Sequence, residues 1–226
     1  MKLLPLARLK GRIEARADFQ NKVLKCKKAN YQCGDACIPR VKKCRLSEKQ
    51  LEKIVHRYED QIKDLPTEKA LIIDDKGRVI LAKNGDETSV SFTYTELLLM
   101  KNSIVTHNHP NLGWDKSDVR SQGLSFSPAD VRLANIVESK EMRAVSHGYR
   151  HSLKPPPSGW NSTFYEYRVK PTYAKYEREV YNEFASKLIA KQISPQVAER
   201  DYHHEVIKRT AKDTGMIYKR EEIKNG

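Results

Sequence analysis

The segment Ser103–Pro110 reads SIVTHNHP: an apolar run that ends in two histidines one residue apart. Its isoleucine and valine predict a short buried strand. Because side chains alternate between the two faces of a strand, His107 and His109 should point to the same side. The end of this strand is therefore predicted to direct two imidazoles at one point.

A second segment, Ser125–Asp130 (SFSPAD), predicts the start of a helix. Ser127 is a good N-cap residue, and the proline that follows it suits the first helical position. Asp130 then falls in the first turn, where the positive end of the helix favours a carboxylate. A catalytic zinc ion takes three protein ligands and keeps a fourth position open. We therefore predict that one zinc ion is bound by His107, His109 and Asp130.

Outside these segments the residue pattern predicts an α+β protein. A charged amphipathic helix at residues 47–62 should be followed by two hairpins, with strands at 69–74, 78–83 and 88–92. The central part continues with helices at 95–101 and 128–139 and strands at 103–106, running into His107, at 142–146 and at 164–169. A C-terminal hairpin is predicted from two helices near 173–191 and 195–212.

These elements divide the chain into three predicted parts. Residues 1–46 form a basic arm and a four-cysteine module, residues 47–170 a metal-binding domain, and residues 171–226 a C-terminal helical extension. In the last part His203 and His204 are adjacent on a predicted helix, so their side chains should point apart. They are expected to be surface residues rather than a second metal site.

The order H-x-H-P and then S-x-x-D, with a glutamate upstream, resembles the JAMM motif of the JAB/MPN metalloprotease family. In that family the two histidines and the aspartate bind zinc, the serine helps to stabilise the tetrahedral intermediate, and the glutamate activates water. The resemblance implies a JAB/MPN-like (cytidine-deaminase-like) mixed β-sheet flanked by helices. It covers roughly residues 66–150, about two fifths of the chain.

Carried over by motif, the resemblance implies the same three zinc ligands, His107, His109 and Asp130. It makes Ser127 the oxyanion-stabilising residue. Glu68, which lies 39 residues before His107 at the head of a predicted strand, takes the position of the catalytic glutamate.

Some positions of this assignment have alternatives. Glu87 and Glu96 are alternatives for the catalytic glutamate. Family members have a shorter gap between the second histidine and the serine, whereas Pro110–Phe126 supplies 17 residues here. The longer stretch could be a substrate-gating loop or could mark a site that has left peptidase chemistry. Its Asp115 and Asp118 are rival carboxylates.

The residues of the two motifs, His-Asn-His-Pro and then Ser-Phe-Ser-Pro-Ala-Asp, are most similar to those of JAB-type domains in phage head-morphogenesis and mobile-element proteins. The resemblance implies a zinc-dependent JAMM-like metallopeptidase or isopeptidase that hydrolyses an amide bond in a protein substrate. The alternative is a non-enzymatic phage virion or nucleoprotein assembly component. In that case the fold is a scaffold, and the partner is DNA or a phage structural protein.

The cysteines of the chain lie within 19 residues: Cys26, Cys33, Cys37 and Cys44. A cluster this small cannot build a hydrophobic core of its own, so it should need a local cross-link, either a bound metal ion or disulfide bonds. A structural zinc ion is the simplest solution for a cytosolic protein, and neighbouring lysines would stabilise the thiolates. The spacing lacks the usual pair of C-x2-C hooks, so two disulfides, or unlinked thiols, are alternatives.

The net charge of +13 is concentrated at the start of the chain. Residues 1–50 hold 14 lysines and arginines against 4 acidic residues. Counterion release would draw such a segment to nucleic acid, although a solvated basic face has the same composition. Apolar runs are far shorter than the roughly 20 residues that span a bilayer, and no signal peptide is recognised. We expect a protein of the host cytoplasm or of a virion, without a membrane partner.

Overall fold

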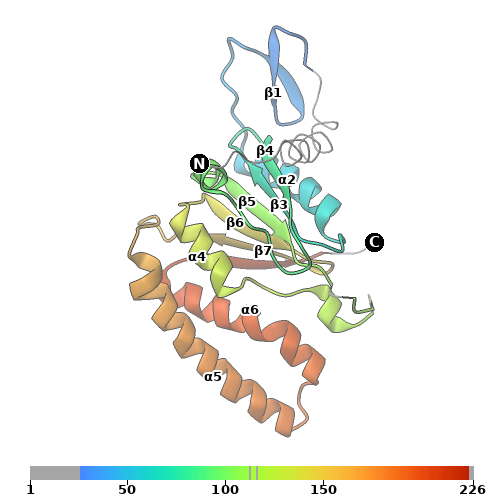
Figure 1. The fold of residues 1–226 in the computed structure, drawn as a ribbon, viewed down its shortest axis with the longest axis vertical. Helices are drawn as coiled ribbons and strands as arrows, with labels where there is room; N and C mark the ends of the chain where they lie inside the picture. The colour runs from blue at the N-terminus through green and yellow to red at the C-terminus, as the bar shows by residue number, and fades with distance from the viewer. Residues whose placement is uncertain (1–25, 112, 116, 224–226) are drawn as a thin grey trace, which may run out of the picture.

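The computed structural model describes residues 26–111, 113–115 and 117–223, so the predicted basic arm lies outside the described residues up to position 25. Its centre is a six-stranded sheet with the strand order β4-β3-β5-β6-β7-β8 (Figure 1). β5 and β6 run parallel, and the other neighbouring strands are antiparallel. The predicted α+β class, with a mixed sheet flanked by helices, is confirmed.

The strands of the sheet include four that the sequence predicted and two that it did not. The bounds are β3 Lys69–Ile73, β4 Val79–Asn84, β5 Ile104–Asn108, β6 Glu141–Val145, β7 Tyr149–Lys154 and β8 Ile217–Glu222. β7 was missed because Arg150, His151 and Ser152, three polar residues, fill its buried centre. β8 was missed because it is a charged edge strand that returns to the sheet from the C-terminal part of the chain.

The helices follow the predicted order closely. Their bounds are α2 Glu48–Ile62, α3 Tyr94–Leu97, η1 Leu98–Met100, η2 Val119–Gln122, α4 Pro128–Ile136, η3 Tyr165–Val169, α5 Lys170–Ile189 and α6 Pro195–Thr214. α2 begins where Ser47 and Gln50 form a reciprocal capping box, and α6 ends at Gly215 in the left-handed conformation. The predicted C-terminal helical hairpin is therefore present as α5 and α6.

Two predicted strands are wrong. Residues 88–92 do not form a strand, because the Asp86 side chain accepts the backbone N–H groups of Thr88 and Ser89 and closes a tight turn. Residues 164–169 lie instead in a π-helical turn, η3, that runs directly into α5. Phe164, directly before η3, makes an edge contact with Trp160.

Helices cover both faces of the sheet (Figure 1). Ile72, Val105 and Met142 belong to the core shared with α4, α5 and α6. Their neighbours Leu71 and Ile104 point the other way, into the core beneath α2. His107 lies two residues after Val105 and therefore on the same face of β5, toward α4. The alternation along β5 decides on which side of the sheet the histidines lie.

A buried ion-pair network fixes α2 to the sheet. Glu59 of α2 is fully buried and accepts hydrogen bonds from Arg143 of β6 at 2.6 Å and from Thr106 of β5 at 3.1 Å. Arg150 of β7 approaches the same carboxylate at 3.2 Å. Loss of one partner would leave a buried charge without compensation, so these contacts hold β5, β6 and α2 in one arrangement.

The four-cysteine module is a separate two-stranded hairpin, β1 Asn30–Cys33 and β2 Ala36–Pro39. Its disulfides pair Cys26 with Cys37 and Cys33 with Cys44. Of the alternatives that the sequence left open, the structure has the two disulfides and not the structural zinc ion. Cys33 pairs across the hairpin with Ala36, so the next residue, Cys37, points to the opposite face, and the four sulfurs do not converge.

Candidate metal centre

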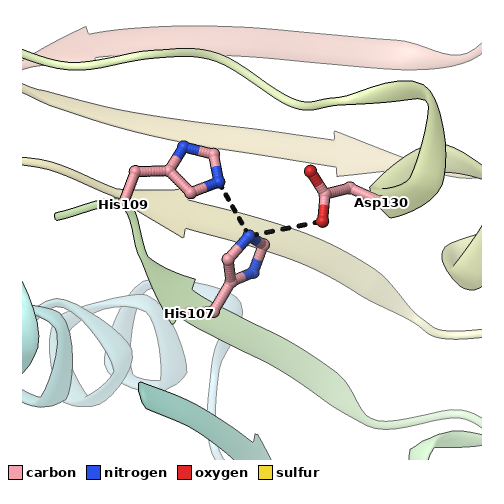
Figure 2. Close-up of side chains that lie close together, drawn as sticks. All are labelled: His107, His109 and Asp130. Atoms are coloured by element: carbon pink, nitrogen blue, oxygen red, sulfur yellow. Dashed lines mark hydrogen bonds and ion pairs between the residues drawn. The ribbon is translucent and has the colours of Figure 1, made fainter. Parts of the chain in front are cut away.

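Two histidines and one aspartate meet at the end of β5 (Figure 2). His107 is on β5, His109 follows the strand, and Asp130 lies in the first turn of α4. The Nε2 atoms of His107 and His109 are 3.0 Å apart, and His107 Nε2 is 3.4 Å from Asp130 Oδ1. The structure therefore brings together the three residues that the sequence predicted as zinc ligands.

The spacing of these atoms fits a single small cation. Donors about 2.0–2.1 Å from a tetrahedral zinc ion lie roughly 3.3 Å from one another, close to the distances found here. One ligand atom from each of the three residues lies within 4.8 Å of the other two. In the described part of the chain one other group meets that criterion, Glu52, His56 and Glu221, and its two carboxylates are exposed.

The local fold gives Asp130 its orientation. Ser127 is the N-cap of α4, and its hydroxyl and backbone N–H both donate to Asp130 Oδ2 at 2.8 Å. The backbone N–H of Asp130 donates in return to the Ser127 hydroxyl at 3.2 Å. This capping box holds one carboxylate oxygen and leaves Oδ1 to face His107.

Both histidines are also held on the side away from the centre. His109 donates from Nδ1 to the carbonyl of Leu124 at 3.0 Å, so its Nε2 is the nitrogen that faces His107 and Asp130. The backbone N–H of His109 donates to Val145 at 2.8 Å, and His107 hydrogen-bonds the backbone of Arg143. Metal-binding histidines are commonly oriented by a second hydrogen bond of this kind.

The surroundings of His107 and Asp130 favour the protonation states that bind a metal ion at neutral pH. Burial lowers the pKa of His107 to about 4, against the opposing effect of Asp130. Burial alone would raise the pKa of Asp130, but His107, His109 and the Ser127 hydrogen bonds hold it below its usual range. The site is thus a neutral imidazole beside an ionised carboxylate.

Glu68 lies at the same cavity, just before β3. The cavity has a volume of about 360 Å³, and its lining includes Glu68, His107, His109, Ser127 and Asp130. Burial raises the pKa of Glu68, and the negative charges of Asp130 and Asp86 add to this while His109 opposes it. A carboxylate with a raised pKa accepts a proton more readily near neutral pH.

Asn108 is a positioning residue that the sequence analysis missed. Its side chain is fully buried and hydrogen-bonds the backbone of the residues before and after Glu68. Asn108 Oδ1 accepts from the Lys69 N–H at 2.6 Å, and Asn108 Nδ2 donates to the Thr67 carbonyl at 3.1 Å. The signal was available, because the residue between two histidines of one strand must face the opposite side of the sheet.

The rival carboxylates have other roles. Glu96 pairs with Lys83 at 2.6 Å, and Asp118 pairs with Arg120 at 2.7 Å. Asp115 closes a turn by accepting from the backbone and hydroxyl of Ser117. Glu87, the other alternative for the catalytic glutamate, lines the same cavity as Glu68 but is exposed, whereas Glu68 is half-buried.

The expectation that His203 and His204 are surface residues is wrong. α6 packs against the sheet, and His204 is 8% exposed, with its Nδ1 2.8 Å from the hydroxyl of Tyr218 on β8. His203 lines the metal cavity. A helix that joins the main core buries more of its circumference than its polar sequence indicates.

Comparisons of the chain with protein-family models, with curated proteins and with solved structures found no match. Within the described residues, none of the helices combines the length and apolar character that a membrane crossing requires. The chemical interpretation of the site therefore rests on the geometry of His107, His109, Asp130 and Glu68.

Proposed function

We propose that this protein is a zinc-dependent metallopeptidase or isopeptidase of the JAMM type that hydrolyses an amide bond in a protein substrate. The observation that carries the proposal is the convergence of two imidazole nitrogens and one carboxylate oxygen, each fixed from behind by a further hydrogen bond. A JAB/MPN-like fold is supported by the place of these residues, at the end of a central strand and in the first turn of the next helix.

Zinc held by His107, His109 and Asp130 would polarise a substrate carbonyl and make water acidic enough to react near neutral pH. Glu68 would take the proton from that water and return it to the leaving amine. Its raised pKa suits both steps, because the group must bind a proton and release it in one cycle.

Ser127 would have two tasks in this scheme. It holds Asp130 through the capping box, as its hydrogen bonds indicate. Ser127 also lines the cavity, as Glu68 does. To stabilise the negative oxygen that develops on the attacked carbonyl, its single hydroxyl proton would turn from Asp130 Oδ2 to that oxygen, while the Ser127 N–H keeps its hydrogen bond to Oδ2. We also propose that the protein belongs to a phage or another mobile element. The residues of the two motifs, 107–110 and 125–130, support this part of the proposal.

The test compares two glutamates that line one cavity. Elemental analysis of the purified chain should find a zinc ion that a chelator removes and that depends on Asp130. Glu68→Gln should keep this zinc and lower the rate of hydrolysis by a factor of about 10² to 10⁴, measured on a panel of unfolded proteins and isopeptide-linked proteins.

Glu87→Gln is the matched control and should retain both zinc and activity. A chain without zinc would refute the metal centre. Full activity in Glu68→Gln would refute the assigned base.

A second candidate function is a non-enzymatic component of a nucleoprotein or phage assembly. It is favoured by the exposed cations of the disulfide module, none of which forms an ion pair with a described residue: Lys27, Lys28, Arg40, Lys42, Lys43 and Arg45. Binding to double-stranded DNA should then weaken steeply with salt, and Lys42→Glu with Lys43→Glu should reduce both the affinity and the salt slope. Salt-independent binding would contradict this function.

A further inference from the structure

A second cavity lies between the two C-terminal helices, next to the metal centre. Its volume is about 440 Å³, within the range of about 300–1,000 Å³ typical of small-molecule sites. α5 contributes Tyr181, Phe184 and Leu188, and α6 contributes Tyr202 and His203. We call it the α5–α6 cavity.

The α5–α6 cavity adjoins the metal cavity. Leu124 and His203 line both of them. The carbonyl of Leu124 is also the group that accepts the hydrogen bond from His109 Nδ1 at 3.0 Å. A substrate polypeptide bound at the metal centre would therefore lie next to the α5–α6 cavity, because Leu124 and His203 form a wall common to both.

The lining of the α5–α6 cavity favours an apolar ligand. The hydroxyl of Tyr202 already donates to the backbone of Glu177 at 2.9 Å, and His203 Nδ1 lies 3.2 Å from the hydroxyl of Tyr173. Glu199, the acidic residue of the lining, lies 3.6 Å from Arg120. These three polar groups have partners, and apart from the hydroxyl of Tyr181 the rest of the lining is aromatic and aliphatic.

The lining offers aromatic surface both to solvent and in the interior. Tyr181 is 64% exposed, and Phe184 is 9% exposed. Aromatic groups bury a large area for few fixed torsions, which makes them efficient anchors in a pocket of this kind.

We propose that the α5–α6 cavity binds a large aromatic or aliphatic side chain of the substrate polypeptide, close to the amide bond that reaches the metal centre. The inference rests on the proposed function and adds a substrate class to it: proteins with a bulky apolar residue near the cleaved bond.

The first experiment uses hydroxamic acids as probes of the zinc-loaded chain. Acetohydroxamic acid carries the metal-binding group alone, and a series of phenylalkyl hydroxamic acids adds an aromatic ring on one to four methylene groups. The best member of the series should bind at least about tenfold more tightly than acetohydroxamic acid, since the added ring gains apolar contact.

Two adjacent residues of α5 provide the matched variants. Ala185 lines the cavity and is half-buried, whereas Ser186 is exposed and does not line it. Ala185→Trp should fill the cavity and abolish the advantage of the phenyl series, and Ser186→Trp should preserve it. Leu188→Ala, a milder change in the same wall, should reduce the advantage several-fold. Thermal unfolding of each variant verifies that it is folded.

The inference is overturned if the phenyl series keeps its advantage in Ala185→Trp, or has none in the unaltered chain. Failure of all hydroxamic acids would instead count against the proposed function. The cavity is then tested without a metal, by titrating N-acetylphenylalanine amide into ¹⁵N-labelled protein. Shifts that Ala185→Trp abolishes and Ser186→Trp retains support the aromatic site, and their absence overturns it.

Two other occupants give different results. If residues 1–25 of this chain fill the cavity, their deletion should strengthen probe binding by tenfold or more. If a second copy fills it, probe affinity should fall as the protein concentration rises and dimers form. Either result overturns the substrate proposal.

Discussion

The sequence indicates a zinc ion at two places, the end of β5 and the four-cysteine module, and of these two the structure brings the candidate ligands to a common point at the end of β5. At the end of β5, His107, His109 and Asp130 converge within metal-binding distance. In the module formed by β1 and β2, four cysteines lie closer together in sequence but pair off as two disulfides. The comparison shows that side-chain direction, not proximity along the chain, decides whether ligands share an ion.

The physical origin of the difference is the same strand alternation in both places. His107 and His109 are two residues apart and point to one side. Cys33 and Cys37 are separated by a turn whose register places them on opposite faces of the hairpin. The candidate metal centre has a third metal-binding group, Asp130, in the first turn of α4. In the cysteine module the sulfurs pair off two by two, Cys26 with Cys37 and Cys33 with Cys44.

The sharpest way to break the comparison is to remove a ligand from the centre. Asp130→Asn should lower zinc affinity at least about 100-fold, because it removes an anionic ligand held in place by Ser127. Isothermal titration with zinc measures the change. Glu221→Gln, in the other group of candidate ligands, serves as the control and should leave this affinity unaltered. Equal losses in both variants would argue against the centre.

The module should respond in the opposite way. Replacing Cys33 and Cys44 together by serine should lower the free energy of unfolding of the module by about 2–5 kcal/mol while leaving the zinc content as it was. Denaturant unfolding monitored at Tyr31, with parallel elemental analysis, makes the comparison. A loss of zinc in this double variant would show that the cysteines contribute to zinc binding.

The pH dependence of the metal-free protein sharpens the account of His107. Its pKa is about 4 when folded and near 6.5 when unfolded, so the unfolded chain binds more protons between these values. The free energy of unfolding should therefore fall as the pH drops through this window, with about 3 kcal/mol from this residue. His204, whose pKa burial also lowers to about 4, acts in the same direction.

Urea unfolding of the metal-free chain between pH 7 and pH 4 measures this effect. His107→Gln should flatten the profile, since glutamine does not titrate. Superimposable profiles for the two proteins would show that His107 does not carry a depressed pKa.

The smallest expected effect concerns the cap of α4. Ser127→Ala removes the hydroxyl that bonds Asp130 and should lower the free energy of unfolding by about 1 kcal/mol. Thermal unfolding of the metal-free chain is the measurement. Ser127→Thr, which keeps the hydroxyl, should recover most of the loss, and no recovery would mean that the capping bond is not the cause.

The disulfides also bear on where the protein functions. Disulfides persist in oxidising environments and are uncommon in the cytosol. The predicted cytoplasmic or virion location stays a prediction, and the redox state of the module in the purified native protein would test it. A fully reduced module would agree with the cytoplasmic alternative.

Sequence alone was sufficient where local rules apply. The period of two along β5 predicted that His107 and His109 share a side, and cap preferences predicted the helix that begins after Ser127. Both depend on a few neighbouring residues, so no long-range information was needed. The same rules predicted β3, β4, β6 and the helices α2, α5 and α6.

Only the tertiary structure decided the rest, because it depends on segments that are remote in sequence. The role of Asn108 follows from its hydrogen bonds to the backbone on either side of Glu68. Residues 217–222 form the strand β8 because they pair with the edge of β7. The pairing of the cysteines follows from the register of one hairpin. Residue preferences describe neighbours along the chain, whereas these features arise from neighbours in space.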